Sequence, residues 1–162
     1  MKTLTLFFAF ALCIAKAQQP NYTALQQLVV SAHPEIDFSN KLLAVCVWQS
    51  DNKQSREQNK EFARTYQTYR QAKLKGGLKG VVFISISTDE NTTNFDIAKQ
   101  KDGIESSATF CDFKAYNANS ILNKTNFDKV TTNVVFDTNG NLIHQNLSTE
   151  AVFKSFNSLI TR

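Results

Sequence analysis

The feature that most constrains this chain is an apolar run followed by a short polar loop and a long polar helix pattern. The run, Leu42–Trp48, has the length and the β-branched and aromatic content of a buried strand. Residues 54–75 are mostly polar, but Phe62, Tyr66 and Tyr69 recur at spacings of four and three, which predicts a helix with one apolar face. Strand, loop and helix in this order predict an α/β fold, and the loop lies where a helix N-terminus offers free N–H groups.

The remaining strand patterns predict a mixed sheet. A second apolar run, Val81–Ser87, is continuous enough to be buried on both faces, as parallel strands are. A short strand is expected at 107–110. Two further strands, at 132–136 and 142–145, flank a turn containing an Asn-Gly pair, which predicts a hairpin.

Four shorter helices complete the pattern. They are predicted at 21–32, at 92–101, at 117–126 and after a cap at Ser148 or Thr149. The Gly76-Gly77 pair predicts the end of the long helix. The residues of the last helix that we expect to face inward are Val152, Phe153, Phe156, Leu159 and Ile160.

The first seventeen residues have the organisation of a secretory signal peptide. Lys2 precedes an apolar segment from Leu4 to Ile14, and Ala15-Lys16-Ala17 supplies a small-residue cleavage site. The apolar segment is shorter than the ~20 residues of a membrane-spanning helix, which favours a cleaved signal over an uncleaved anchor. We therefore expect an exported protein of the periplasm or cell envelope, or a secreted one, without a transmembrane segment in the mature chain.

The charge of the mature chain excludes one class of partner. Removing residues 1–17 takes away Lys2 and Lys16, so the formal charge falls from +4 to +2. Both signs are interspersed, which predicts no nucleic-acid binding. The cluster of Lys73, Lys75 and Lys79 has two interpretations, a solvated helix end or a contact for an acidic partner.

Residues around the loop carry a family pattern. Trp48, Ser50, Arg56 and Glu57 stand in the register of a strand ending in Trp-x-Ser, then an aromatic residue, Cys-x-x-Cys, Arg or Lys, and Glu. In this pattern the chain resembles the thioredoxin-like superfamily, and within it the secreted, bacterial TlpA or thiol:disulfide-interchange (redoxin) branch. The two cysteine positions of that pattern fall here on Asn52 and Ser55.

The predicted hairpin extends the resemblance. Residues 130–140 are similar to the family's Val-Pro-Thr-x-(apolar)₃-Asp-x-x-Gly segment, and Thr131 stands where the family has a cis-proline facing the cysteine pair. A cis bond at a non-proline residue costs ~2.5–4 kcal/mol, so we expect a trans peptide at Thr131. The resemblance covers 41–162 and implies a thioredoxin-like domain, a central mixed sheet with flanking helices and an inserted strand and helix, preceded by a helical extension at 18–40.

The resemblance also implies a peptide-binding site, but the thiols that dithiol exchange requires are absent from it. Relatives bind extended peptides in a pocket that here is expected between Trp48–Ser55 and residues 131–133. The residues expected to line it are Trp48, Ser50, Asp51, Arg56 and Thr132. Dithiol exchange requires a thiolate at the helix N-terminus and a second thiol three positions later, and neither Asn52 nor Ser55 can supply one.

The remaining cysteines suggest no disulfide. Cys13 leaves with the signal, Cys46 lies inside an apolar strand as a small buried side chain, and Cys111 lies at a strand end. In the resembling fold Cys46 and Cys111 are two strands apart, ~9–10 Å, whereas a disulfide needs Cα atoms within ~7 Å. Cys111 is the one candidate for a lone reactive thiol, although no Lys, Arg or His adjoins it to lower its pKa.

No motif predicts a metal or a cofactor. His33 and His144 have no Cys or carboxylate neighbours at ligand spacing, and His144 is expected on a solvated strand face. Four Asn-x-Ser/Thr sequons, beginning at residues 21, 91, 123 and 146, matter only in a eukaryotic host.

Three functional hypotheses follow. The first is an exported thioredoxin-like protein without dithiol activity that acts as a binding or structural module for a protein or peptide partner. The second is a thiol-disulfide oxidoreductase or redox protein of the cell envelope that uses Cys111 alone. The third is a component of a larger envelope assembly.

Overall fold

The computed structural model describes residues 19–159, except 105, 114, 116 and 131. The expected signal segment and the peptide at Thr131 lie outside the described residues. The elements, in chain order, are α1 (Tyr22–Ala32), β1 (Leu42–Trp48), α2 (Lys53–Tyr69), a 3₁₀ turn (Lys75–Gly77), β2 (Val81–Ser87), α3 (Thr92–Asp102), β3 (Ala108–Cys111), α4 (Ile121–Lys124), β4 (Asn133–Phe136), β5 (Leu142–Gln145) and α5 (Thr149–Ser158).

The strands form one mixed five-stranded sheet in the order β3-β2-β1-β4-β5. β1, β2 and β3 run parallel, β4 runs antiparallel to β1, and β5 returns antiparallel to β4. Every residue of β1 and β2 is buried, as the continuous apolar runs predicted. The α/β fold with a mixed sheet, flanking helices and an inserted strand and helix is confirmed.

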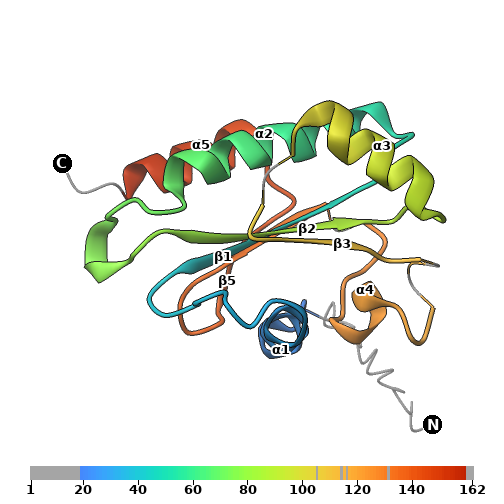
Figure 1. Ribbon diagram of the computed structural model, residues 1–162. Helices are drawn as coiled ribbons and strands as arrows, with labels where there is room; N and C mark the ends of the chain where they lie inside the picture. The colour runs from blue at the N-terminus through green and yellow to red at the C-terminus, as the bar shows by residue number, and fades with distance from the viewer. Residues whose placement is uncertain (1–18, 105, 114, 116, 131, 160–162) are drawn as a thin grey trace, which may run out of the picture.

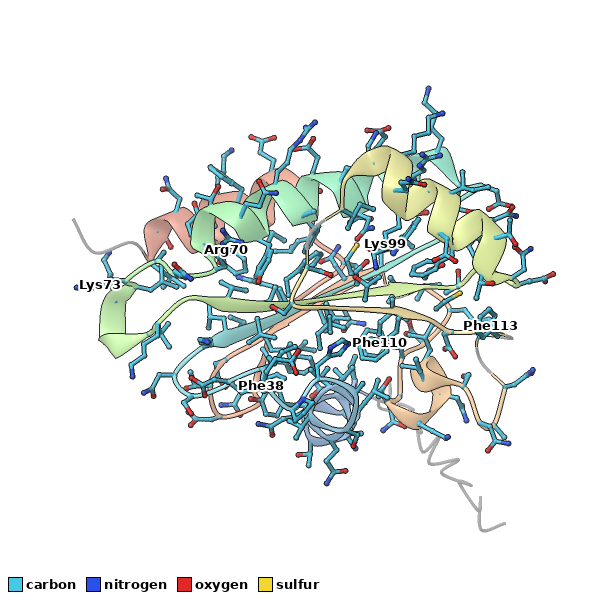
Figure 2. All side chains as sticks on the ribbon, viewed as in Figure 1. Phe38, Arg70, Lys73, Lys99, Phe110 and Phe113 are labelled. Carbon is cyan, nitrogen blue, oxygen red and sulfur yellow. The ribbon has the colours of Figure 1, made fainter. Side chains whose placement is uncertain are left out.

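Helices cover both faces of the sheet (Figure 1). α2, α3 and α5 lie on one face, and α1 and α4 lie on the other. Alternate residues of the strands feed two separate cores: Phe62 and Phe156 pack with Phe83 on the first face, and Leu25 and Leu122 pack on the second. Figure 2 shows Phe38 and Phe110 on the α1 side, where both pack against the second core.

The long helix is shorter than its pattern predicted. α2 ends at Tyr69, so Gly76-Gly77 is not its C-cap, which corrects the expectation from the sequence. Leu74 explains the early end: it is 3% exposed, and in a continued helix it would lie about 140° away from the inward Tyr69. Leaving the helix axis lets Leu74 turn back into the core.

Two smaller differences have local causes. The helix expected at 117–126 is reduced to α4, because the carboxylate of Asp112 and the hydroxyl of Ser120 accept from the first N–H groups at Ile121–Asn123 and fix its start. Phe153 of α5 was expected to face inward but is 42% exposed, with its ring edge against Tyr69. Ser148 is the N-cap of α5, one of the two residues predicted for that role.

Candidate functional site

The loop between β1 and α2 lies at the carboxyl end of the parallel strands, where open α/β sheets place ligand sites. Asn52 is the N-cap of α2: its Oδ1 accepts from the Ser55 N–H at 3.0 Å. The Ser55 hydroxyl accepts from the Gln49 N–H at 3.1 Å and lies within hydrogen-bond distance of the Gln49 and Asn52 carbonyl oxygens. Both residues at the family's cysteine positions therefore hold the loop and the helix start together.

This arrangement occupies the N–H group that would otherwise stabilise an anion. A thiolate at a helix N-terminus is favoured by the first N–H groups and by the helix dipole. Here the neutral amide oxygen of Asn52 accepts from one of those N–H groups, so the loop is a capped helix start.

Ser50 is fixed by a buried carboxylate. Asp89 is 3% exposed, and its Oδ1 accepts from the Ser50 N–H at 3.0 Å and from the Ser50 hydroxyl at 2.7 Å. The Ser87 hydroxyl donates to Asp89 Oδ2 at 2.6 Å. Asp89 thus ties the loop to the end of β2, and neighbouring Asp51 is exposed.

The sequence pattern missed Asp89 as a loop partner. A helix was predicted at 92–101, and the residue that caps it, as α3, is Asn91. Ser50 and Asp89 are 39 positions apart, and no local periodicity relates them.

Trp48 lies in the core under the loop. It is 1% exposed, so it does not line an open pocket. Its indole Nε1 donates to the Ser85 hydroxyl at 2.8 Å, and that hydroxyl donates to Asn59 Oδ1 at 3.0 Å. The buried Asn59 Nδ2 has no hydrogen-bond partner among the described residues. Trp48, at the family's Trp position, therefore packs beneath the loop and is held there by hydrogen bonds that run through Ser85 to Asn59.

Arg56 is directed away from the loop into an ion pair. Its Nε and one terminal nitrogen donate to the two oxygens of Asp102 at 2.5 and 2.7 Å. The Asp102 side chain is 4% exposed, and the hydrogen bonds from Arg56 hold the pKa of Asp102 below its usual value. This two-point contact joins the first turn of α2 to the end of α3.

The opposite segment of the predicted pocket begins at Thr132, since Thr131 lies outside the described residues. The Thr132 N–H donates to Asn146 Oδ1 at 2.8 Å, and its carbonyl accepts from the Val47 N–H at 2.8 Å. The buried Asn133 exchanges hydrogen bonds with the backbone of Leu147. Side-chain amides thus fix the start of β4 against the β5–α5 connection.

A groove of about 470 Å³ adjoins this segment. Its lining residues are Gln54, Glu57, Gln58, Glu61, Thr132, Asn146, Leu147, Ser148 and Thr149. Among the predicted site residues that the structure describes, only Thr132 lines it. Gln54, which lies between the family's cysteine positions Asn52 and Ser55, is on the wall of this groove, so the groove adjoins the start of α2.

The two described cysteines are both free, and they are held apart. Cys46 pairs in register with Ser85, whereas Cys111 pairs with Ser87 on the far side of β2. The expectation of no disulfide is confirmed. Burial raises the pKa of the Cys46 thiol, and burial together with the charges of Asp89, Asp96 and Asp112 raises that of Cys111.

The histidines form no metal site. Within the described part of the chain, no group of three or more His, Cys, Asp and Glu side chains could hold a metal ion. His144, which was expected on a solvated strand face, is half-buried, with Nε2 2.7 Å from the Ser155 hydroxyl. None of the described helices has both the length and the apolarity needed to cross a bilayer.

The sheet order, the capped loop at the end of β1 and the β4–β5 hairpin define a class: a thioredoxin-like fold without a cysteine pair at the start of α2. A family model described as thioredoxin-like matches residues 40–142. The chain belongs to the thioredoxin-like family. No curated protein matches it.

Several solved structures with the same fold are described as thiol-disulfide proteins. The chain is similar to the thioredoxin domain of a thiol-disulfide oxidoreductase from Bacteroides vulgatus, with 15% identity, 77% of this chain and 83% of that chain covered, and a TM-score of 0.60. It is similar to a thiol:disulfide interchange protein from a Bacteroides species, with 15% identity, 76% of each chain covered and a TM-score of 0.59. A secreted disulfide oxidoreductase from Mycobacterium tuberculosis matches with 12% identity, 75% and 84% coverage and a TM-score of 0.57. At these identities the likeness establishes the fold alone.

Proposed function

We propose that this chain is an exported thioredoxin-like protein that lacks dithiol redox activity and acts as a binding or structural module for a protein or peptide partner. One observation carries the proposal. The positions of the two family cysteines hold Asn52 and Ser55, whose polar atoms close the loop and cap α2. A thioredoxin-like fold whose loop is held by these hydrogen bonds, without the two cysteine sulfurs, can keep a binding surface but cannot carry out thiol-disulfide exchange.

Export rests on the leading segment and on the kind of protein that shares the fold. Residues 1–17 have the three parts of a signal peptide. The Mycobacterium tuberculosis relative is described as secreted. Cleavage after Ala17 is tested by N-terminal sequencing of protein recovered from the medium or the periplasm, with Gln18 expected as the first residue.

The surface proposed for the partner is the groove beside Thr132 together with the exposed start of α2. Gln54 is exposed on its wall, so Gln54→Arg introduces bulk and charge there without touching the core. Gln67 is exposed on the same helix outside the groove, which makes Gln67→Arg a matched control.

Insulin-disulfide reduction by dithiothreitol tests the absence of exchange chemistry. The mature protein is expected to leave the rate equal to that of dithiothreitol alone. Turnover comparable to that of a Cys-x-x-Cys thioredoxin would refute the proposal.

Affinity capture from the native envelope tests the binding role. Partners retained by the wild type and by Gln67→Arg are expected to be lost with Gln54→Arg. If all three proteins retain the same partners, the partner binds at a surface other than this groove.

The alternative function, a redox protein using Cys111 alone, rests on the thiol's position. Cys111 is half-buried and lines an open hollow of about 580 Å³ with Phe113 and Ile121. Its raised pKa leaves little thiolate at neutral pH, which favours the binding module. Alkylation of Cys111 at pH 7 faster than that of an ordinary free thiol would reverse this preference.

A further inference from the structure

The groove beside Thr132 has one wall made by a single face of α2. Gln54, Glu57, Gln58 and Glu61 follow the spacing of three, one and three residues that places side chains in one row on a helix. The facing wall is the β5–α5 connection, with Leu147 as its partly buried apolar residue. The groove is therefore a trough that runs along the first turns of α2.

Among the described residues that line this groove, the ionisable side chains are two carboxylates. Glu57 and Glu61 are four residues apart, and like charges at that spacing repel each other on a helix surface. Their side chains are 56% and 47% exposed, so both are accessible to a ligand. A cation placed between them or beside each would relieve this repulsion.

Each carboxylate already has a neighbouring cation, but outside the groove. Lys60 Nζ is 2.7 Å from Glu57 Oε1, and Arg64 contacts Glu61. Neither Lys60 nor Arg64 lines the groove. Arg64 and Glu61 form an exposed pair, whereas Glu57 pairs with a half-buried lysine. Ion pairs at a spacing of three residues on a helix surface contribute little to stability and are screened by salt. A ligand cation can therefore share these carboxylates without a large loss of protein stability.

The facing wall offers hydrogen-bond donors suited to carbonyl oxygens. Thr149 lines the groove, and its N–H group belongs to the first turn of α5, where no carbonyl of the helix can accept from it. The Ser148 side chain is already used to cap the Ala151 N–H. Polypeptide carbonyls are neutral acceptors, so they fit beside the carboxylates of the opposite wall.

The spacing of the carboxylates selects the conformation of the ligand. Four residues of an α-helix rise about 6 Å. In an extended peptide, two residues on the same side are about 6.6 Å apart, because side chains alternate with a period of two. Two basic side chains separated by one residue therefore match Glu57 and Glu61.

We propose that this groove binds an extended peptide segment carrying a basic-x-basic pattern, with its two Lys or Arg side chains at Glu57 and Glu61. This inference rests on the proposed function and gives the partner a chemistry. The cations lie along α2, the backbone lies between the walls, and the residue between the two cations points outward.

Fluorescence anisotropy with the labelled peptide Gly-Lys-Ser-Lys-Gly tests the inference on the folded mature protein at low ionic strength. Glu57→Gln/Glu61→Gln is expected to weaken binding about five- to tenfold, and added potassium chloride is expected to weaken wild-type binding. Glu35→Gln/Glu90→Gln removes the same charge at two exposed positions outside the groove and is expected to bind as the wild type does.

A permuted peptide separates spacing from charge. Gly-Lys-Lys-Ser-Gly has the same composition, but its lysines point to opposite sides of an extended chain, so weaker binding is expected. Equal affinity for both peptides and for Gly-Gln-Ser-Gln-Gly would overturn the proposal, as would unchanged affinity in Glu57→Gln/Glu61→Gln. Circular dichroism of each variant verifies the fold.

The two proposals can fail separately. Loss of native partners with Gln54→Arg, with no preference among the three peptides, would leave the binding module standing and reject the basic-x-basic ligand. A preference for Gly-Lys-Ser-Lys-Gly together with insulin reduction at thioredoxin rates would leave the groove standing and reject the non-redox function.

Discussion

At the scale of residues, the two substituted cysteine positions have become structural. The Asn52 amide oxygen and the Ser55 hydroxyl make hydrogen bonds that a thiol makes weakly. The sequence already contained part of this information, because Asn is among the preferred N-cap residues. What the sequence could not show is that Ser50 is held by Asp89, a partner from another connection.

Asn52→Ala tests the capping role. Removing the Oδ1 acceptor leaves the Ser55 N–H without its partner, so the free energy of unfolding is expected to fall by about 1 kcal/mol. Urea unfolding followed by circular dichroism measures this. Asn52→Asp keeps an acceptor and adds a charge that the helix N-terminus favours, so it is expected to be at least as stable as the wild type. A fall of the same size in both variants would contradict the capping role.

At the scale of elements, long-range contacts fix how the helices sit on the sheet. Arg56 and Asp102 join α2 to α3 across 46 positions, and Trp48 joins β1 to β2 through Ser85. The apolar patterns predicted these helices and strands but not their cross-links. In the family motif Arg56 belongs to the active-site segment, whereas here it forms a structural ion pair.

Asp102→Asn is expected to destabilise the protein in a pH-dependent way. The folded pKa of Asp102 lies below its ordinary value of 3.8, so its ion pair stabilises the fold above that pH. That stabilisation is lost as pH falls through the folded pKa. Urea unfolding should show a cost of about 1–3 kcal/mol at pH 7 and a smaller difference between wild type and variant below pH 3. An equal cost at both pH values would assign the effect to packing.

The tight approach of the α2–β2 connection to the end of α2 gives another prediction at this scale. Gly80 has φ +117°, and a Cβ there would lie 2.4 Å from the Arg70 carbonyl oxygen. Gly80→Ala is therefore expected to cost about 2 kcal/mol or more in thermal or urea unfolding. Gly76→Ala, at φ +73° with nothing within 4 Å, isolates the backbone cost, about 1 kcal/mol. If the two variants lose the same stability, the steric contact is unimportant.

At the scale of the whole molecule, the architecture of a disulfide-handling family persists without its sulfur pair. Asn52→Cys/Ser55→Cys places two thiols one helical turn apart at the start of α2, the register of the family motif. The double variant is expected to lose both added thiols on mild oxidation and to reduce insulin faster than the wild type. Thiol titration under denaturing conditions measures the first result, with Asn52→Cys alone as the control that cannot close a ring. If the double variant stays reduced, the loop no longer has the geometry of the family.

The sequence by itself determined the elements and the class of fold. Buried strands, capped helices and the family loop are local patterns with periods of two and 3.6 residues, so they can be read from neighbouring residues. Only the tertiary structure decided the early end of α2, the burial of Trp48, the partner of Ser50 and the groove whose walls are α2 and the β5–α5 connection. These depend on strand order, which brings together residues tens of positions apart, and no pattern within one segment encodes that order.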